Sequence, residues 1–390
     1  MSWPFVLTIV VLSLTAANSV TAQALTGLTR KTGEAADPFS NAASLQELPD
    51  GRVLVADAQE RRLLIVDFER GGEVKQLGRN GNGPNEYGSA QTLTRGRGDT
   101  VLLLDFPAHR VLRIAPNGTL AGTEVFDIGV SGPLPGEKPS GTRITSAPRF
   151  ADVNGGLYFE VGYFDAARGI DPQRLLARWD PATRQTKPIG TLNLWYPTKS
   201  TRWRAPFMYQ DVWAVAPDGR VARVVPVDYH VEWYKDGTLV AQGAPVPYEP
   251  VRVTKEDREA WYRARASQGS AGSAQMSGPP ARPGSEPKDQ PKVPRPPGFT
   301  DADFPDVKPP FVEDYVGRSM FVSYDGQVWV MRTSVFDAKT REVDVFDGAG
   351  KRIRRLSIPA TDRVAGVGKS SIYVIRTDDD GLQWLARYPR

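Results

Sequence analysis

The sequence predicts an all-β fold built from repeated antiparallel sheets, and three observations support this prediction. Its apolar runs are short and rich in β-branched and aromatic residues, while Gly 37 and Pro 33 are spread along the 390 residues. The stretch 51–88 contains short β-rich runs, a Gly71-Gly72 turn and a glycine-rich exit loop. Weaker copies of the same order of strands and turns follow as far as the C-terminus. The repetition therefore predicts the architecture.

The first repeat shows the unit most clearly. Strands are expected at 42–48, 52–56, 63–68 and 73–77, separated by turns at 49–51, 57–61 and 70–72. The second of these strands is nearly continuous in apolar residues, as expected of a strand that is covered on both faces. The unit is thus a four-stranded antiparallel meander.

Later copies of this unit bring the number of repeats to six. Their clearest strands are 101–105 and 110–114, 157–164 and 174–180, 220–227 and 229–234, 328–332 and 343–347, and 371–376 and 382–388. Such sheets cover one another when they pack radially, which predicts a six-bladed β-propeller. The sixth copy has only three strands. We therefore expect the amino-terminal run Leu25–Arg30 to supply the missing strand and close the ring by pairing with the last blade.

Residues 1–24 have the pattern of a secretory signal peptide. The apolar run Phe5–Leu14 is followed by small and polar residues and by Ala22-Gln23-Ala24, which resembles a cleavage site. The run is too short to span a bilayer comfortably. We expect a periplasmic or secreted protein in which residues 25–390 form the propeller, without stable membrane insertion after cleavage. An uncleaved membrane anchor is the alternative.

One long segment interrupts the repeats between the fourth and fifth blades. Residues Lys255–Ala266 have the charge and alanine content of a short helix. The segment Ser267–Gly298 is rich in Ser, Gly and Pro and cannot bury enough apolar surface to offset its ordering entropy. We interpret it as a disordered insertion. A linker between two domains is disfavoured because the repeats on either side belong to one ring.

Composition excludes several classes of function. The chain has no Cys and His 2, so disulfides, Cys-ligated zinc, thiol nucleophiles and multi-histidine metal sites are excluded. The net charge of +4 is scattered along the chain rather than concentrated on one helix or face, so a nucleic-acid partner is not expected. We predict no cofactor and no metal site, and we expect a monomer.

The first repeat resembles the NHL-type repeat, whose core runs Gly-x-φ-φ-Val-x-Asp, a polar loop, Arg-φ, an apolar strand and a Gly turn. Gly51, Val55, Asp57, Arg62-Leu63 and Gly71-Gly72 stand at those positions. The loop GRNGNGPNEYG at 78–88 is similar to the segment that links blades in secreted bacterial six-bladed propellers of this group, with Tyr87 where Phe is commoner. The resemblance implies the architecture; propellers host many unrelated functions.

Several conspicuous motifs are expected to be structural. His109 lies at a corner between strands beside Arg110, and the pairs Asp57–Arg62 and Asp105–Arg110 are expected to satisfy buried polar groups. The loop 78–88 is followed by no helix and has no Lys-Ser/Thr, which argues against a phosphate loop. We interpret Asp378-Asp379-Asp380 as a solvated hairpin turn rather than a calcium loop.

Strand direction predicts where function lies. The hairpin turns at 50–51 and 71–72 share one face of the ring, while the 57–61 corner and all crossings between blades share the other. Because long irregular loops gather on that second face, we expect the binding site there. The candidate ligand-binding residues are Arg149, Arg202, Trp203, Arg204, Tyr209 and Asp211.

Two functions remain open from the sequence. The first is a non-catalytic module that binds a protein, peptide or glycan through the loop-rich face. The second, by resemblance to other propeller families, is a gluconolactonase-like or amidating-lyase-like hydrolase or lyase, in which carboxylate, Asn or His ligands hold a metal in the central channel. No innermost strand shows a clear Glu or His directed at the axis, so the first is favoured.

Overall fold

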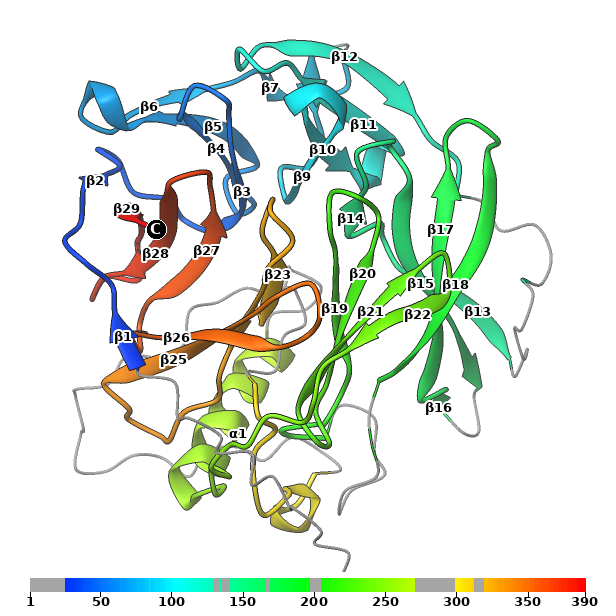
Figure 1. The fold of residues 1–390 in the computed structure, drawn as a ribbon, viewed down its shortest axis with the longest axis vertical. Helices are drawn as coiled ribbons and strands as arrows, with labels where there is room; N and C mark the ends of the chain where they lie inside the picture. The colour runs from blue at the N-terminus through cyan, green and yellow to red at the C-terminus, as the bar shows by residue number, and fades with distance from the viewer. Residues whose placement is uncertain are drawn as a thin grey trace, which may run out of the picture.

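The chain forms a ring of six antiparallel sheets around a central axis (Figure 1). The computed structural model describes residues 25–83, 85–128, 134, 141–165, 169–194, 196, 205–270, 299–311 and 319–390. The prediction of an all-β, six-bladed β-propeller is confirmed. Across these described ranges, no helix has the length and apolar character required to cross a membrane. The predicted leader at 1–24 lies outside them.

The first three blades follow the chain from their innermost to their outermost strand. The first comprises β3 (Ala42–Glu47), β4 (Val53–Asp57), β5 (Arg62–Asp67) and β6 (Glu73–Gln76), and the second β9 (Thr92–Arg95), β10 (Val101–Asp105), β11 (Arg110–Ile114) and β12 (Leu120–Val125). The third has an interrupted inner edge, β13 (Thr142–Thr145) and β14 (Phe150–Ala151), followed by β15 (Leu157–Asp165), β17 (Gln173–Asp180) and β18 (Gln185–Asn193). The short β16 (Gly169–Ile170) pairs with the end of β15, and β7 (Arg79–Asn80) pairs with β8 (Glu86–Tyr87) within the exit loop.

The other three blades repeat this order. The fourth comprises β19 (Val212–Val215), β20 (Val221–Val225), β21 (His230–Lys235) and β22 (Thr238–Gln242). The fifth comprises β23 (Met320–Val322), β24 (Val328–Met331), β25 (Thr340–Phe346) and β26 (Arg352–Pro359), and the sixth β27 (Arg363–Val367), β28 (Ser371–Thr377) and β29 (Gln383–Pro389). The predicted strands agree with these bounds to within a few residues.

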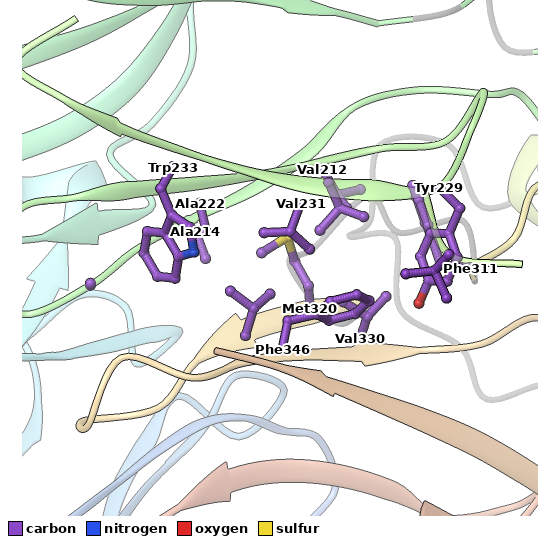
Figure 2. Packing of buried hydrophobic residues seen from close by; sticks show 14 residues of the cluster. Val212, Ala214, Ala222, Tyr229, Val231, Trp233, Phe311, Met320, Val330 and Phe346 are labelled. Carbon is purple, nitrogen blue, oxygen red and sulfur yellow. The ribbon is translucent and has the colours of Figure 1, made fainter. Parts of the chain in front are cut away.

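The hydrophobic core lies between neighbouring blades. Figure 2 shows the cluster between the fourth and fifth, where Val231 and Trp233 of one sheet face Met320, Val330 and Phe346 of the next. Similar clusters join the first blade to the second, the second to the third, the third to the fourth, and the fifth to the sixth. A further cluster joins the sixth blade back to the first. Burial of both faces explains the nearly continuous apolar runs of the inner strands.

The amino terminus closes the ring with a different segment from the one predicted. The run Leu25–Arg30 does not join the sixth blade: β1 (Leu25–Gly27) pairs in parallel with β26, at the outer edge of the fifth blade. The fourth strand of the sixth blade is β2 (Gly33–Glu34), which pairs antiparallel with β29. The prediction that an amino-terminal strand completes the last blade is therefore confirmed. The assignment of 25–30 was wrong because its short β-compatible pattern fits either exposed edge.

The helix of the insertion is docked on the ring. Helix α1 (Lys255–Ser270) covers the predicted 255–266 and continues for one more turn. Asp257 caps its start by accepting the Thr254 N–H, and its other oxygen forms a buried ion pair with Lys308 Nζ at 2.6 Å. Residues 271–298 lie outside the described part of the chain, so their predicted disorder stays a prediction.

Candidate functional site

A cavity of about 770 Å3 runs along the axis of the ring, lined by the inner strands of all six blades. Antiparallel pairing fixes the direction of each inner strand. All of them begin at the end of the ring that carries the crossings between blades, here called the loop-rich end, and finish at the end that carries the hairpin turns, the turn-rich end. The cavity therefore presents side chains from six parallel strand edges.

Four charged residues are among the described residues that line this cavity: Glu47 on β3, Arg95 on β9, Arg149 before β14 and Arg363 on β27. Most other polar lining groups are neutral hydroxyls and amides, including those of Asn41, Ser44, Gln46, Gln59, Gln91, Thr92 and Ser146. Guanidinium groups thus outnumber carboxylates in the described lining, which favours anionic ligands.

The ladders place these charges at different depths. Glu47 and Arg95 each lie one residue before the position whose N–H closes the hairpin turn, Leu48 and Gly96. Arg149 lies three strand positions before Asp152, whose N–H closes the next hairpin turn. Arg363 lies four paired positions before Gly368, the corresponding residue of its own strand, since the extra residue in the bulge between Val364 and Gly366 has no partner. At about 3.4 Å per residue, Arg149 is about 7 Å nearer the loop-rich end than Glu47.

Two side chains meet across the channel at the turn-rich end. The Arg95 guanidinium lies 5.5 Å from the ring centroid of Tyr324, which belongs to the fifth blade, opposite the second. Arg95 also donates to the Glu47 carbonyl at 3.2 Å and to the Asp99 carboxylate at 3.1 Å. This cation–π contact narrows the turn-rich end. Glu47 therefore lies near the turn-rich end of the cavity, at the same level as Arg95.

The environment of Glu47 makes its carboxyl a weaker acid than usual. Burial raises the pKa of its carboxyl above the ordinary 4.5, and the hydrogen bond from the Lys369 N–H, with the charge of Arg95, opposes that rise only in part. Glu47 Oε2 accepts the Lys369 N–H at 2.9 Å. A Cβ on Gly368 would lie 1.1 Å from Oε2, so glycine at 368 is what allows the carboxylate to sit there.

Arg149 is held by the wall of the third blade. Its Nη1 donates to Glu160 Oε1 at 3.4 Å, and its guanidinium lies 5.7 Å from the ring of Trp213 and 5.9 Å from that of Phe150. Trp213 Nε1 donates to the same Glu160 oxygen at 2.9 Å, and Arg174 Nη1 donates to the other at 3.0 Å. One carboxylate thus accepts hydrogen bonds from two guanidiniums, and Arg149 also lies against two aromatic rings.

Arg363 stands on the sixth blade, opposite the third. One of its Nη groups donates to the Ala42 carbonyl of the first blade. Its chain neighbour Asp362 is buried, and burial raises the pKa of that carboxyl despite the hydrogen bond from Thr361 and the charges of Arg376 and Arg341. Arg341 Nε is buried without a hydrogen-bond partner.

The donor set does not fit the channel metal expected of a gluconolactonase-like or amidating-lyase-like site. No group of three or more His, Cys, Asp or Glu residues in the described ranges could hold a metal ion. Glu47 is the single carboxylate among the described lining residues, and Arg95 lies beside it. Guanidiniums repel a divalent cation, so we derive no chemical step through a metal.

The candidate ligand-binding residues predicted from the sequence lie in different surroundings in the structure. Arg149 lines the channel. Tyr209 donates its hydroxyl to the Lys308 carbonyl at 3.1 Å, and buried Asp211 accepts the Tyr196 hydroxyl at 2.7 Å and the Asn193 N–H at 2.9 Å. The side chains of Tyr209 and Asp211 therefore form hydrogen bonds within the wall of the ring. The remaining candidates, Arg202, Trp203 and Arg204, lie outside the described residues, and their proposed role stays a prediction.

The structural roles expected for the repeat motifs agree with the observed contacts. Arg62 lies 3.7 Å from Asp57, and Arg110 Nε donates to Asp105 at 2.9 Å while its other nitrogens bind carbonyls of the exit loop. His109 takes a left-handed backbone conformation at the corner and stacks between two Phe rings. The three-aspartate segment forms the turn between β28 and β29, where Asp378 accepts backbone N–H groups.

Sequence reasoning missed Glu47, Arg95 and Arg363. A usable signal was present, because each stands near the end or the start of an inner strand whose flanking turn was recognised. What the sequence lacked was the neighbour across the ring, such as Tyr324 for Arg95 or the Lys369 N–H for Glu47.

No family model matches the sequence, and no curated protein matches it. The NHL-type resemblance is therefore not confirmed at the family level, although the six-bladed architecture is. Solved structures similar to this chain include a gluconolactonase from Xanthomonas campestris, with TM-score 0.40, 12% identity, and coverage of 93% of this chain and 94% of that one.

Two further solved structures are similar to the chain at comparably low identity. A calcium-binding regucalcin from Agrobacterium tumefaciens has TM-score 0.40 and 12% identity, covering 94% of this chain and 97% of its own. A virginiamycin B lyase from Staphylococcus aureus has TM-score 0.34 and 9% identity, covering 89% and 79%. Similarities this low do not assign an activity to this chain, so function must be argued from the channel.

Proposed function

We propose that this protein is a hydrolase or lyase that acts on a small anionic molecule in its central channel, with Glu47 as the proton-transfer group. The observation that carries the proposal is a partly buried carboxylate with a raised pKa in a cavity of about 770 Å3, where the other charged residues of the described lining are arginines. Perturbed carboxyl groups in clefts are frequent at functional sites.

The spacing of the charges suits such a reaction. Arg149, about 7 Å along the axis from the level of Glu47, would hold the acid group of a molecule whose reactive atom reaches Glu47. Ionised Glu47 would then accept a proton from a water that attacks an ester or lactone carbonyl, and return it to the alcohol oxygen that leaves as the acyl C–O bond breaks. In the elimination route it would accept a proton from a carbon atom next to an electron-withdrawing group, and the hydroxyl on the adjacent carbon would take up a proton and leave as water while the alkene forms. The positive charge of the nearby Arg95 favours the ionised form of Glu47 and so opposes the rise of its pKa.

Partner capture on the loop-rich face has weaker support. Two of its six predicted residues, Tyr209 and Asp211, are engaged in hydrogen bonds within the wall, and Arg149 lines the channel instead. A channel site requires no macromolecular partner.

Turnover and the substitution Glu47→Gln test the proposal together. Purified protein would be incubated with a panel of lactones, esters and hydroxy acids that carry an acid group, with proton release and alkene absorbance followed in time. The wild type should turn over at least one class, and Glu47→Gln should lower its kcat by about a hundredfold or more, since a positioned base contributes that much.

Glu124→Gln is the matched control because Glu124 lies on the outermost strand of the second blade with its side chain 57% exposed. It should leave kcat unchanged. Equal rates for Glu47→Gln and wild type would contradict the role of Glu47. Ligand binding in the channel without turnover of any compound would show a binding protein rather than an enzyme.

A further inference from the structure

The ring of Tyr324 lies against the Arg95 guanidinium from across the channel. Tyr324 is in the turn between β23 and β24 of the fifth blade, and Arg95 is the last residue of β9 in the second. The guanidinium carbon lies 5.5 Å from the ring centroid, and both residues line the channel. The inner strands contact each other in ring order, so this contact joins two opposite blades.

Two oxygen acceptors compete for the Arg95 guanidinium. Its Nη2 donates to the Glu47 carbonyl at 3.2 Å, which keeps the positive charge next to Glu47. Its Nη1 donates to the carboxylate of Asp99 at 3.1 Å, and the Asp99 side chain is 52% exposed at the turn-rich end. A guanidinium that turned fully to this carboxylate could form a bidentate pair with it and would leave Glu47.

The turn that carries Tyr324 is held by hydrogen bonds from two blades. The Ser323 N–H donates to the Gln327 carbonyl at 2.8 Å, and the Ser323 hydroxyl donates to the Asp325 carboxylate at 2.6 Å. Arg390, directly after β29 of the sixth blade, forms an ion pair with Asp325 and donates to Gln327 Oε1 at 3.0 Å. The backbone that carries the ring is therefore fixed at the channel wall.

Several ionisable groups act on the Glu47 carboxyl. They are Arg95 on β9, Lys369 in the turn after β27, Arg387 on β29 and Tyr373 on β28. Burial raises the pKa of Glu47, and among the charges that oppose this rise that of Arg95 has the largest effect. Burial and the charge of Glu47 raise the pKa of the Tyr373 phenol, which therefore stays neutral. The placement of Arg95 thus matters more to Glu47 than that of the other cations.

We propose that Tyr324 is a positioning residue whose ring keeps the Arg95 guanidinium beside Glu47, against the competing carboxylate of Asp99, and so favours the ionised form of Glu47. A cation over the face of an aromatic ring is attracted by the ring quadrupole, and this attraction requires no hydroxyl. The inference deepens the proposed function, since it rests on Glu47 as the proton-transfer group, and it makes the fifth blade part of the site.

Carbon-13 NMR tests the role of Tyr324 without any need for turnover. The side-chain carboxyl carbons of glutamate would be labelled, and the Glu47 resonance assigned by its absence in Glu47→Gln. The pKa of Glu47 would then be measured for wild type, Tyr324→Leu, Tyr324→Phe and Arg95→Gln. Tyr324→Leu should raise it, in the same direction as Arg95→Gln, because the guanidinium becomes free to turn to Asp99. Tyr324→Phe keeps the ring and should leave the pKa of Glu47 at its wild-type value.

Phe336→Leu is the matched control. Phe336 is an aromatic residue of the same blade, 38% exposed in the loop between β24 and β25 at the loop-rich end, and its substitution should leave the pKa of Glu47 unchanged. Circular dichroism would verify that each variant folds, and Tyr324→Gln would replace Tyr324→Leu if that variant does not.

The outcomes separate this role from the proposed activity. An unchanged pKa of Glu47 in Tyr324→Leu, or an equal rise in Tyr324→Phe, would overturn the positioning role even if turnover depends on Glu47. A rise in Tyr324→Leu alone, with no turnover of any compound by the wild type, would leave the positioning role standing and reject the enzyme.

Discussion

The acidity of Glu47 is set by two opposing effects. Burial raises its pKa, while the Lys369 N–H and the charge of Arg95 lower it, and the net shift is upward from 4.5. A general base works only when ionised, so the acidic limb of the kcat/KM profile should lie above the pH range of an ordinary Glu. Measuring kcat/KM against pH tests this. A limb at or below 4.5 would contradict the assignment of the base.

The substitution Arg95→Gln sharpens the pH test. Since the positive charge lowers the pKa of Glu47, its removal should move the acidic limb to still higher pH. The exposed Arg113 on the second blade offers the control Arg113→Gln, which should leave the limb in place. If Arg95 has only a structural role, Arg95→Gln should lower the melting temperature without moving the acidic limb of the kcat/KM profile.

At the scale of single residues, contacts between residues close in the sequence were easier to predict than contacts between residues of different blades. The pairs Asp57–Arg62 and Asp105–Arg110 were predictable because their members flank one turn. Glu47 was not, because its environment comes from Lys369 and Arg95, which lie in other blades. Arg149 was predicted from its place on an inner strand, but its aromatic support, Trp213, comes from the next blade.

At the scale of elements, the amino-terminal segment contributes to the ring unequally along its length. β1 is exposed throughout, whereas Phe39 is fully buried in the cluster that joins the first and sixth blades. Phe39 also exchanges backbone hydrogen bonds with Gln383, and Ala35 N–H donates to the Leu385 carbonyl at 2.8 Å. The residues that close the ring therefore lie after β1.

Two substitutions test this division. Phe39→Ala should lower the free energy of unfolding by about 3–5 kcal/mol, as expected for a large side chain removed from a packed core. Leu25→Ala, at a position that is 49% exposed in β1, should change it by less than about 0.5 kcal/mol. Chemical denaturation measures both. Equal losses, or a larger loss at Leu25, would show that β1 carries the closure.

The pattern of elements explains why strands were predictable and their partners were not. Alternating turns and apolar runs determine where strands begin and end, since these signals are local. Which edge a short strand joins depends on unpaired backbone groups elsewhere, and both the fifth and sixth blades offered such an edge to the amino terminus. The docking of α1 through Asp257 and Lys308 likewise depends on residues far apart in the sequence.

At the scale of the whole molecule, ring closure creates the channel. Six sheets that cover one another's faces leave their inner strands to surround one cavity, so the repeat that predicted the fold also required an axial space. The sequence did not predict the charge of that space, because each of its arginines comes from a different repeat. Arg95, Arg149 and Arg363 become one cationic lining only when the ring closes.

The location of a bound anion is the most direct test of whether the channel is the working site. Crystals of the protein would be soaked in selenate, a tetrahedral dianion whose selenium is located by anomalous scattering, and the soak repeated with Arg149→Gln. We expect the strongest anomalous peak in the channel beside Arg149, and its loss in the variant. Peaks confined to the outer faces of the ring, or a channel peak unchanged in Arg149→Gln, would contradict a working site in the channel.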